Sequence, residues 1–391
     1  MLTVKKSMAN SGKRIQMVDL GGQYLKIKNE IDAAISNVLE SCAFINGPQV
    51  KQFAAHLAEY LGVKHVIPCA NGTDALQISL MALELKPGDE VIVPAFTYVA
   101  TAEVIGLLGL TPVMVDVDYS TFNTTLKNIE RALTSKTKAI VPVHLFGQSC
   151  DMEPILNFAR EYSLHVVEDN AQALGAEYTF SNGVKCKTGT MGTIGCTSFF
   201  PSKNLGCYGD GGAIMTNDDL LAERLAMIAN HGQKVKYHHS VIGCNSRLDT
   251  IQAAVLDVKL KYLDSYCMAR RTAAQYYTSK LQEFDPQQRY FELPQVAPNT
   301  THVYHQYTLK IKGGLRDALK EHLAGHGVPS MVYYPLPLQA QEAFEGIAVA
   351  AEKLDIAEKL SESVLSLPIH TELDYETQDF IIECIKEFYS K

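Results

Sequence analysis

Several features that would assign a chain to a membrane, secreted or disulfide-rich class are missing from this sequence. No stretch approaches the ~20 consecutive apolar residues that a bilayer-spanning helix needs. Residues 1–14 carry charge but no apolar segment follows them, so we expect no secretory signal. Nine cysteines are scattered through 391 residues without a C-x-x-C pair, and Cys42, Cys69 and Cys150 lie in or beside apolar runs. We therefore expect buried, reduced thiols in a cytoplasmic protein.

The signatures of two large nucleotide-binding classes are also absent. No G-x-x-x-x-G-K-[ST] segment occurs, which excludes a nucleotide P-loop of that type. No G-x-G-x-x-G follows an expected strand, and the glycines at 206–212 lie between two strands rather than opening a helix. This pattern argues against an NAD-dependent oxidoreductase. A net charge of −8 argues against nucleic acid or an anionic membrane as the main partner.

The composition is that of a large globular protein. Apolar residues make up 47% of the chain and charged residues 20%, which are ordinary values. Single hydrophobic cores stop growing near ~250–300 residues. A chain of 391 residues therefore predicts a large domain over 1–260 and a smaller one over 261–391.

The order of apolar segments predicts an α/β fold. After a helical region at 21–62, short β-branched runs alternate with amphipathic stretches; the expected strands are 90–95, 111–117, 139–145, 164–169, 196–200 and 212–217. Because these runs are apolar on both faces, they predict a mostly parallel sheet covered by helices. One long helix at 247–284 should follow. A smaller C-terminal α+β domain should then contain a strand at 305–312, a helix at 315–327, a strand at 328–334 and a pair of helices.

Three segments carry candidate chemistry where ligands bind in such sheets, beyond the carboxyl ends of the strands. Residues 69–74 open directly into a helix, whose free N–H groups attract a phosphate. A capped helix start that binds no ligand would have the same sequence pattern. Glu168 and Asp169 end the strand at 164–169. A carboxylate such as Asp169 there either pairs with a protonated ring nitrogen or caps the next helix.

The third segment places Lys203 between an apolar strand and the glycine-rich loop at 206–212. Partial burial would lower the pKa of its amine and free it to form a Schiff base, whereas the alternative is a surface lysine in a flexible loop. A phosphate cradle, an acid for a ring nitrogen and an amine match the phosphate, pyridine and aldehyde of pyridoxal 5'-phosphate. The three segments together predict that this cofactor is bound.

From about residue 16 to its C-terminus, the chain resembles the DegT/DnrJ/StrS family of sugar aminotransferases. The segments that carry the resemblance are QMVDLGGQYLKIKNEID, FINGPQV, ANGTDALQ, PAFTYVATAE, VEDNAQALGA, TSFFPSKNLGCYGDGGAI, NSRLDTIQAA and YYPLPLQ. The resemblance implies the type I, aspartate-aminotransferase-like fold. It also implies that Lys203 is catalytic, holding the cofactor and then moving a proton between cofactor and substrate carbons.

Further cofactor contacts are implied for matching positions. Asp169 would pair with the pyridine nitrogen, and Gln172 would contact the ring hydroxyl. Tyr98 would stack on the ring face, unless it is a core aromatic. The residues that would hold the phosphate are Gly72, Thr73, Ser198 and, from the neighbouring subunit, Asn245. The last contact implies a homodimer with shared active sites.

Substrate contacts follow from the same resemblance. The blocks around 196–213 and 231–239 are similar to enzymes that act on UDP-2-acetamido-2-deoxy-3-oxo-glucuronate with glutamate as amino donor, in bacterial surface polysaccharide biosynthesis. Arg247 would meet acidic groups of the substrate. His231 would face a uronate carboxylate or a diphosphate, or have a structural role on a loop. Tyr333 and Tyr334 stand where those enzymes have His-Tyr, which leaves another 3-keto or 4-keto sugar on dTDP, UDP or GDP as the alternative.

Two other functions exist on related chains. Sugar dehydratases with this fold carry a histidine at the position of Lys203, and a non-enzymatic regulator would not need the lysine, the acid and the phosphate cradle together. We therefore expect ping-pong transfer, in which glutamate gives up its amino group and leaves as 2-oxoglutarate before the nucleotide sugar accepts the group.

Overall fold

The computed structural model describes residues 14–390. Residues 1–13, on which most of the expectation of a missing secretory signal rests, lie outside the described residues. Within 14–390, no helix combines the length and apolar character needed to cross a membrane.

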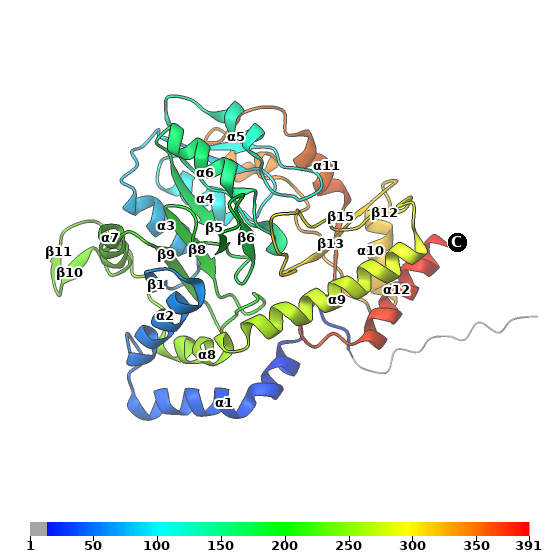
Figure 1. Ribbon diagram of the computed structural model, residues 1–391, viewed down its shortest axis with the longest axis horizontal. Coiled ribbons are helices and arrows are strands. Elements are labelled where there is room, and N and C mark those ends of the chain that lie inside the picture. The colour runs from blue at the N-terminus through cyan, green and yellow to red at the C-terminus, as the bar shows by residue number, and fades with distance from the viewer. Residues whose placement is uncertain (1–13, 391) are drawn as a thin grey trace, which may run out of the picture.

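The centre of the described structure is an eight-stranded sheet in the order β1-β9-β8-β5-β4-β2-β3-β14. Figure 1 labels β1, β9, β8 and β5 of this sheet. β9 pairs antiparallel with β1 and β8, and the other neighbours in this sheet pair in parallel. The predicted mostly parallel α/β sheet is confirmed. Its strands are β1 (His65–Cys69), β2 (Glu90–Pro94), β3 (Thr111–Val115), β4 (Thr137–Ile140), β5 (His165–Asp169), β8 (Ile194–Ser198), β9 (Gly212–Thr216) and β14 (Val349–Ala350).

Helices cover both faces of this sheet because successive strand residues point to opposite sides. Val91 and Val93 of β2 pack with one set of helices, whereas Ile92 between them packs with the other. The first set is α3 (Gly72–Ala82), α4 (Ala100–Leu107) and α7 (Asp219–Ala229). The second set is α5 (Leu126–Ala132) and α6 (Met152–Glu161). Both sides of the strands are therefore buried, as their continuous apolar sequences predicted.

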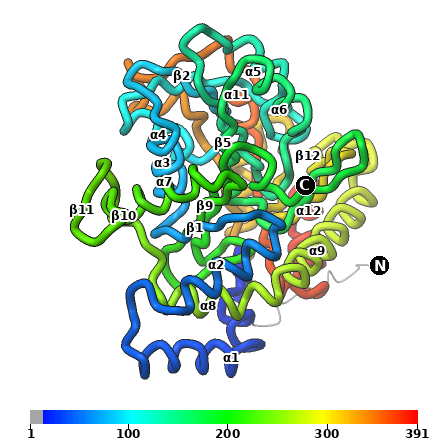
Figure 2. Tube along the Cα trace, turned by 60° about the vertical axis from the view of Figure 1, so that its left-hand side comes forward, coloured from blue at the N-terminus to red at the C-terminus, as the bar shows by residue number. Residues whose placement is uncertain are grey.

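The helical N-terminal region and the long helix of the sequence prediction each form two helices. The first pair is α1 (Leu20–Ser41) and α2 (Pro48–Leu61), separated at the Asn46-Gly47-Pro48 break. The expected single helix at 247–284 was wrong, since the chain forms α8 (Thr250–Leu260) and α9 (Leu263–Phe284), with a break at 261–262. Figure 2 shows α1, α2 and α8 gathered at one end of the molecule, with α9 leading away from them.

A second, three-stranded antiparallel sheet contains β12 (Phe291–Glu292), β13 (Tyr307–Ile311) and β15 (Val364–Leu367). It shares a core with α9, α10 (Arg316–Gly325) and α12 (Tyr375–Tyr389). The predicted strand at 328–334 was wrong, since these residues form no strand and contribute only the bridge between Met331 and Ser366. The predicted pair of C-terminal helices is present as α11 (Asp355–Ser363) and α12, and β15, which was not predicted, lies between them in the sequence.

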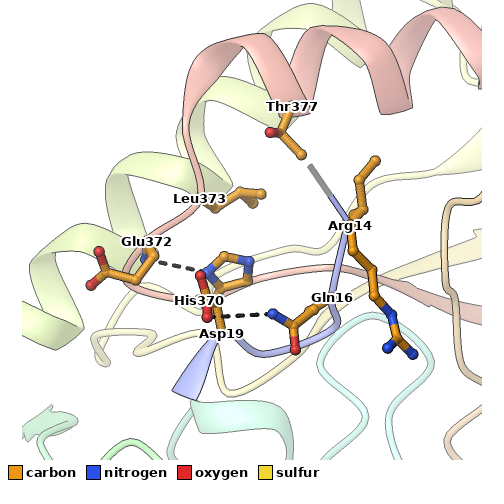
Figure 3. A pocket seen from close by; sticks show the side chains of 8 residues that line it. Arg14, Gln16, Asp19, His370, Glu372, Leu373 and Thr377 are labelled. Atoms are coloured by element: carbon orange, nitrogen blue, oxygen red, sulfur yellow. Dashed lines mark hydrogen bonds between the residues drawn. The ribbon is translucent and has the colours of Figure 1, made fainter. Parts of the chain in front are cut away.

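The first and the last part of the described chain lie side by side. Residues 14–19 lie beside 370–377, around a small hollow of about 20 Å³ (Figure 3). The side chain of Gln16 donates to Asp19, which in turn caps α1 by accepting from Gly22 N. The remaining elements are two hairpins and three short helices: β6 (Glu177–Thr179), β7 (Lys185–Lys187), β10 (Gln233–Val235), β11 (His238–His239), η1 (Leu145–Gly147), η2 (Leu338–Ala340) and η3 (Glu342–Phe344).

Candidate active site

A cavity of about 700 Å³ opens at the carboxyl ends of the parallel strands. This is the place where open α/β sheets bind ligands, and the volume is in the range of small-molecule sites. Nine of the residues predicted from the sequence line it: Gly72, Thr73, Tyr98, Asp169, Gln172, Ser198, Lys203, Tyr333 and Tyr334.

The start of α3 forms one wall of the cavity. Asn71 caps this helix, since its side chain accepts from Asp74 N at 2.8 Å. Gly72 begins the helix so close to β8 that a Cβ on it would lie 2.7 Å from Ser198 Cβ. Only glycine therefore permits the approach. The unpaired N–H groups of a first helical turn, with the hydroxyls of Thr73 and Ser198, form a donor set suited to an anion.

The two acidic residues at the end of β5 have different environments. Asp169 lines the cavity, with Oδ2 accepting from Thr101 Oγ1 at 2.7 Å and Oδ1 accepting from Ala171 N at 3.1 Å. Glu168 is fully buried away from the cavity-lining set. Because adjacent strand residues point to opposite faces, only one of the two can face the ligand.

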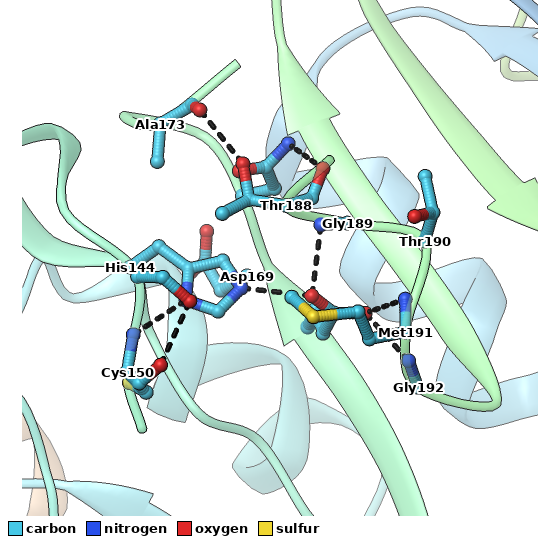
Figure 4. Close-up of polar contacts among 12 residues, drawn as sticks. His144, Cys150, Asp169, Ala173, Thr188, Gly189, Thr190, Met191 and Gly192 are labelled. Carbon is cyan, nitrogen blue, oxygen red and sulfur yellow. Dashed lines mark hydrogen bonds and ion pairs between the residues drawn. The ribbon is translucent and has the colours of Figure 1, made fainter. Parts of the chain in front are cut away.

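Glu168 anchors the loop that follows β7. Its carboxylate accepts from His144 Nε2 at 2.9 Å, from Gly189 N at 2.8 Å, and from Met191 N and Gly192 N at 2.6 Å each (Figure 4). His144 is held in turn by Cys150 N, which donates to its Nδ1. A buried carboxylate with four donors is satisfied. Glu168 therefore supports the floor of the site from behind.

Lys203 follows β8 and lines the cavity. Burial lowers the pKa of its amine from 10.5 to about 8, and the nearby negative charge of Asp169 offsets part of that effect. The loop beyond it is compact, since a Cβ on Gly206 would lie 2.3 Å from the carbonyl oxygen of Pro201. A tight loop with a partly neutral amine suits a nucleophile or a proton carrier.

Aromatic and amide side chains form the remaining wall. Gln172 Oε1 accepts from Phe146 N at 2.8 Å, and its Nε2 donates to Tyr334 OH at 3.0 Å. The ring of Tyr98 is 6.2 Å from that of Tyr334, and Tyr98 is 56% exposed. The alternative of a core aromatic is therefore wrong for Tyr98, whose ring is available to a ligand.

Three predicted residues do not line the cavity of this single chain: His231, Asn245 and Arg247. His231 is exposed, and its carbonyl oxygen is the partner of His239 Nδ1. Asn245 is exposed and forms a bridge with Asn230, and Arg247 is half-buried two residues further on. The contacts expected of them, including that of Asn245 across a subunit interface, stay predictions.

Several residues of the site were not singled out from the sequence. His305, Gln306 and Thr97 line the cavity, although Thr97 follows the expected strand at 90–95 and lies within the segment PAFTYVATAE. His305 is 6% exposed, and burial, reinforced by the positive charges of Lys203 and Arg270, holds its pKa well below the ordinary value. Its Nδ1 and Thr97 Oγ1 have no hydrogen-bond partner within residues 14–390. Buried polar atoms are nearly always paired, so these two are available to a ligand.

Comparison with known proteins gives a consistent family. The sequence model of the DegT/DnrJ/EryC1/StrS aminotransferase family matches residues 25–386. A pleiotropic regulatory protein of Geobacillus stearothermophilus is 47% identical over 375 residues, covering 96% of this chain and 98% of that protein. The UDP-2-acetamido-2-deoxy-3-oxo-D-glucuronate aminotransferase of Pseudomonas aeruginosa is 45% identical over 360 residues, covering 92% and 96%. A solved DegT DnrJ EryC1 StrS aminotransferase from Brucella abortus matches with a TM-score of 0.90 at 41% identity, covering 96% and 100%.

Proposed function

Because the chain belongs to the DegT/DnrJ/EryC1/StrS aminotransferase family, we propose that it moves the amino group of glutamate onto a keto sugar carried by a nucleotide. The protein is a pyridoxal-phosphate-dependent aminotransferase with the type I fold. The observation that carries the proposal is the meeting of Lys203, Asp169 and the start of α3 in one cavity.

The donor set of the cavity fits this cofactor. The first N–H groups of α3 and the hydroxyls of Thr73 and Ser198 would hold the phosphate. Glycine at position 72 is what allows the start of α3 to lie this close to Ser198. Asp169 offers a carboxylate to a protonated ring nitrogen. The unpaired hydroxyl of Thr97 leaves one more polar contact for the ligand. When bound, pyridoxal phosphate supplies the stabilisation of negative charge on the reacting carbon.

The chain's own residues would position the reactants and move protons. The Lys203 amine would take a proton from the α-carbon of the donor and later return one to the sugar carbon. A pKa of about 8 keeps a usable fraction of this amine neutral near pH 7. Thr101 holds the carboxylate of Asp169 in place as a positioning residue. Tyr98 would cover one face of a flat ligand at the cavity mouth.

The sugar we propose is UDP-2-acetamido-2-deoxy-3-oxo-glucuronate, for bacterial surface polysaccharide. The support is the relative of that activity from Pseudomonas aeruginosa, which spans nearly the whole chain. Tyr333 and Tyr334 line the cavity at the position where the sequence departs from the expected His-Tyr pair. Another 3-keto or 4-keto nucleotide sugar is the second candidate, because relatives named for dTDP-sugar and GDP-sugar products are 38–40% identical to this chain.

We also propose a homodimer, acting in the cytoplasm, in which a second copy completes the site. Asn245 and the neighbouring Arg247 do not reach the cavity of their own chain. Asn245 is exposed, so it is free to contact another copy. In this arrangement Asn245 would reach the cofactor phosphate of the other subunit, and Arg247 and His231 would meet the acidic groups of the sugar.

A coupled assay tests reaction, donor and sugar together. The keto sugar is generated in place by its dehydrogenase, glutamate is added, and the aminated sugar is sought by mass. Product supports the whole proposal. A yellow protein that loses its colour with glutamate but yields no product would remove only the sugar, whereas a colourless protein that cannot be reconstituted would contradict the aminotransferase itself.

Substitution of Lys203 gives the matched control. Lys203→Ala should abolish turnover while the circular dichroism spectrum stays unchanged. Lys353→Ala removes an exposed lysine that does not line the cavity, and it should leave turnover intact. Turnover near that of the wild type in Lys203→Ala would contradict the proposed role.

A further inference from the structure

A second group of ligand-type side chains lies outside the catalytic cavity, between two helices that cover the smaller sheet. His322 lies in the last turn of α10, and His326 follows it at the helix end, four residues on. Glu387 projects from α12, which packs against α10 (Figure 1). One ligand atom from each of the three side chains lies within 4.8 Å of the others.

Backbone carbonyl groups fix which ring nitrogens carry protons. His322 Nε2 is 3.0 Å from the carbonyl oxygen of Cys384, and His326 Nδ1 is 2.8 Å from the carbonyl oxygen of His322. A carbonyl oxygen only accepts, so each of these nitrogens donates. The lone pairs are therefore on His322 Nδ1 and His326 Nε2. Such outer contacts to carbonyl groups are what orients histidines that bind metals.

The carboxylate of Glu387 completes the set. Its Oε2 is 3.6 Å from His326 Nε2, the nitrogen that bears the lone pair in this tautomer. A simple ion pair between His326 and Glu387 would account for this contact. The second imidazole, that of His322, adds a third ligand-type group beside this pair, with its ring centre 4.4 Å from that of His326.

We propose that His322, His326 and Glu387 bind one divalent transition-metal ion, with Zn²⁺ the best match, and that the ion ties α10 to α12. Two imidazoles and a carboxylate suit Zn²⁺, whereas Ca²⁺ and Mg²⁺ prefer sites made entirely of oxygen. Three protein ligands leave the fourth tetrahedral position for water. The ion would lie apart from the catalytic cavity, because none of the three residues lines that cavity.

The geometry requires only side-chain movement. Metal–nitrogen bonds of about 2.0–2.1 Å place tetrahedral ligand atoms roughly 3.3 Å apart. The present spacing is within 4.8 Å. The side chains of His326 and Glu387 are 36% and 43% exposed, so both ligands lie at the surface, where an ion can reach them. His322 is the better-anchored ligand, since it is half-buried and bonded to α12.

Titration of the chelator-treated holoenzyme with Zn²⁺ tests the site, and Co²⁺ absorption reports its coordination. All samples carry Cys42→Ser, because Cys42 is an exposed thiol and would bind Zn²⁺ itself. We expect one ion per chain, at least tenfold weaker binding in His326→Ala and Glu387→Gln, and tetrahedral Co²⁺ bands that both variants lose.

His56→Ala is the matched control. His56 is an exposed histidine paired with a single carboxylate, that of Asp257, at 2.6 Å, without a second imidazole. Its loss should leave Zn²⁺ binding unchanged. Zn²⁺ should also raise the thermal midpoint of the protein and of His56→Ala but not of His326→Ala, since a ligand stabilises the state that binds it. Equal binding in all the proteins, or no binding in any, would overturn the proposal.

Discussion

The amine of Lys203 should react with acylating reagents at neutral pH far faster than a lysine of ordinary pKa. Burial disfavours the charged form and lowers the pKa from 10.5 to about 8, while the negative charge of Asp169 acts in the opposite direction. At about pH 7, a pKa of 8 leaves roughly a tenth of the amine neutral, whereas 10.5 leaves roughly 0.03%. Because only the neutral amine is a nucleophile, its reactive fraction should be about 300-fold larger.

Competitive labelling of cofactor-free protein measures this pKa. Traces of acetic anhydride are added across the alkaline range, and acetylated peptides are quantified by mass spectrometry. Labelling of Lys203 should rise with pH through a midpoint near 8 and then level off. Lys353 serves as an internal reference, since its hydrogen bond to Asp355 raises its pKa above 10.5.

Asp169→Asn separates burial from charge. Removing the negative charge takes away the contribution that raises the pKa, so the midpoint for Lys203 should move below that of the unchanged protein. A midpoint near 10.5 in the unchanged protein would refute the argument from burial. A midpoint that rises in Asp169→Asn would refute the assigned direction of the charge effect.

Three further substitutions test the support of the site. Glu168→Gln should lower the free energy of unfolding by about 3 kcal/mol, because an amide N–H₂ would face donors that the carboxylate now satisfies. Urea unfolding measures this free energy, and a loss below about 1 kcal/mol would contradict the anchoring role. Gly72→Ala would place a Cβ 2.7 Å from Ser198 Cβ and should weaken cofactor binding roughly tenfold. Equilibrium dialysis measures this affinity, and an unchanged value would contradict a phosphate site at the start of α3. Thr101→Val removes a hydrogen bond to the charged Asp169, which contributes about 1.5–3 kcal/mol, and should lower kcat tenfold to a hundredfold. Thr101→Ser keeps a hydroxyl and should keep most of the activity. Equal kcat values for Thr101→Val and the unchanged protein would show that Asp169 does not depend on this hydrogen bond.

The sequence alone determined the α/β class and most of the ligand-facing positions. Alternation of apolar runs is a local property, so the parallel sheet and its covering helices could be read from it. Strand ends followed by glycine, acid and lysine marked Gly72, Asp169 and Lys203, and these do line one cavity. These patterns can be recognised in the sequence because each depends on only a few neighbouring residues.

The tertiary structure alone decided which distant groups complete the site. His305 lines the cavity because the segment before β13 of the second sheet lies beside it, and no local pattern marks this residue. The break between α8 and α9 at 261–262 was not predicted. The strand β15 was not predicted either, because a strand of four residues is decided by its pairing with β13 rather than by its own sequence. Long-range pairing and packing set these features, and a linear sequence does not display which segments will meet.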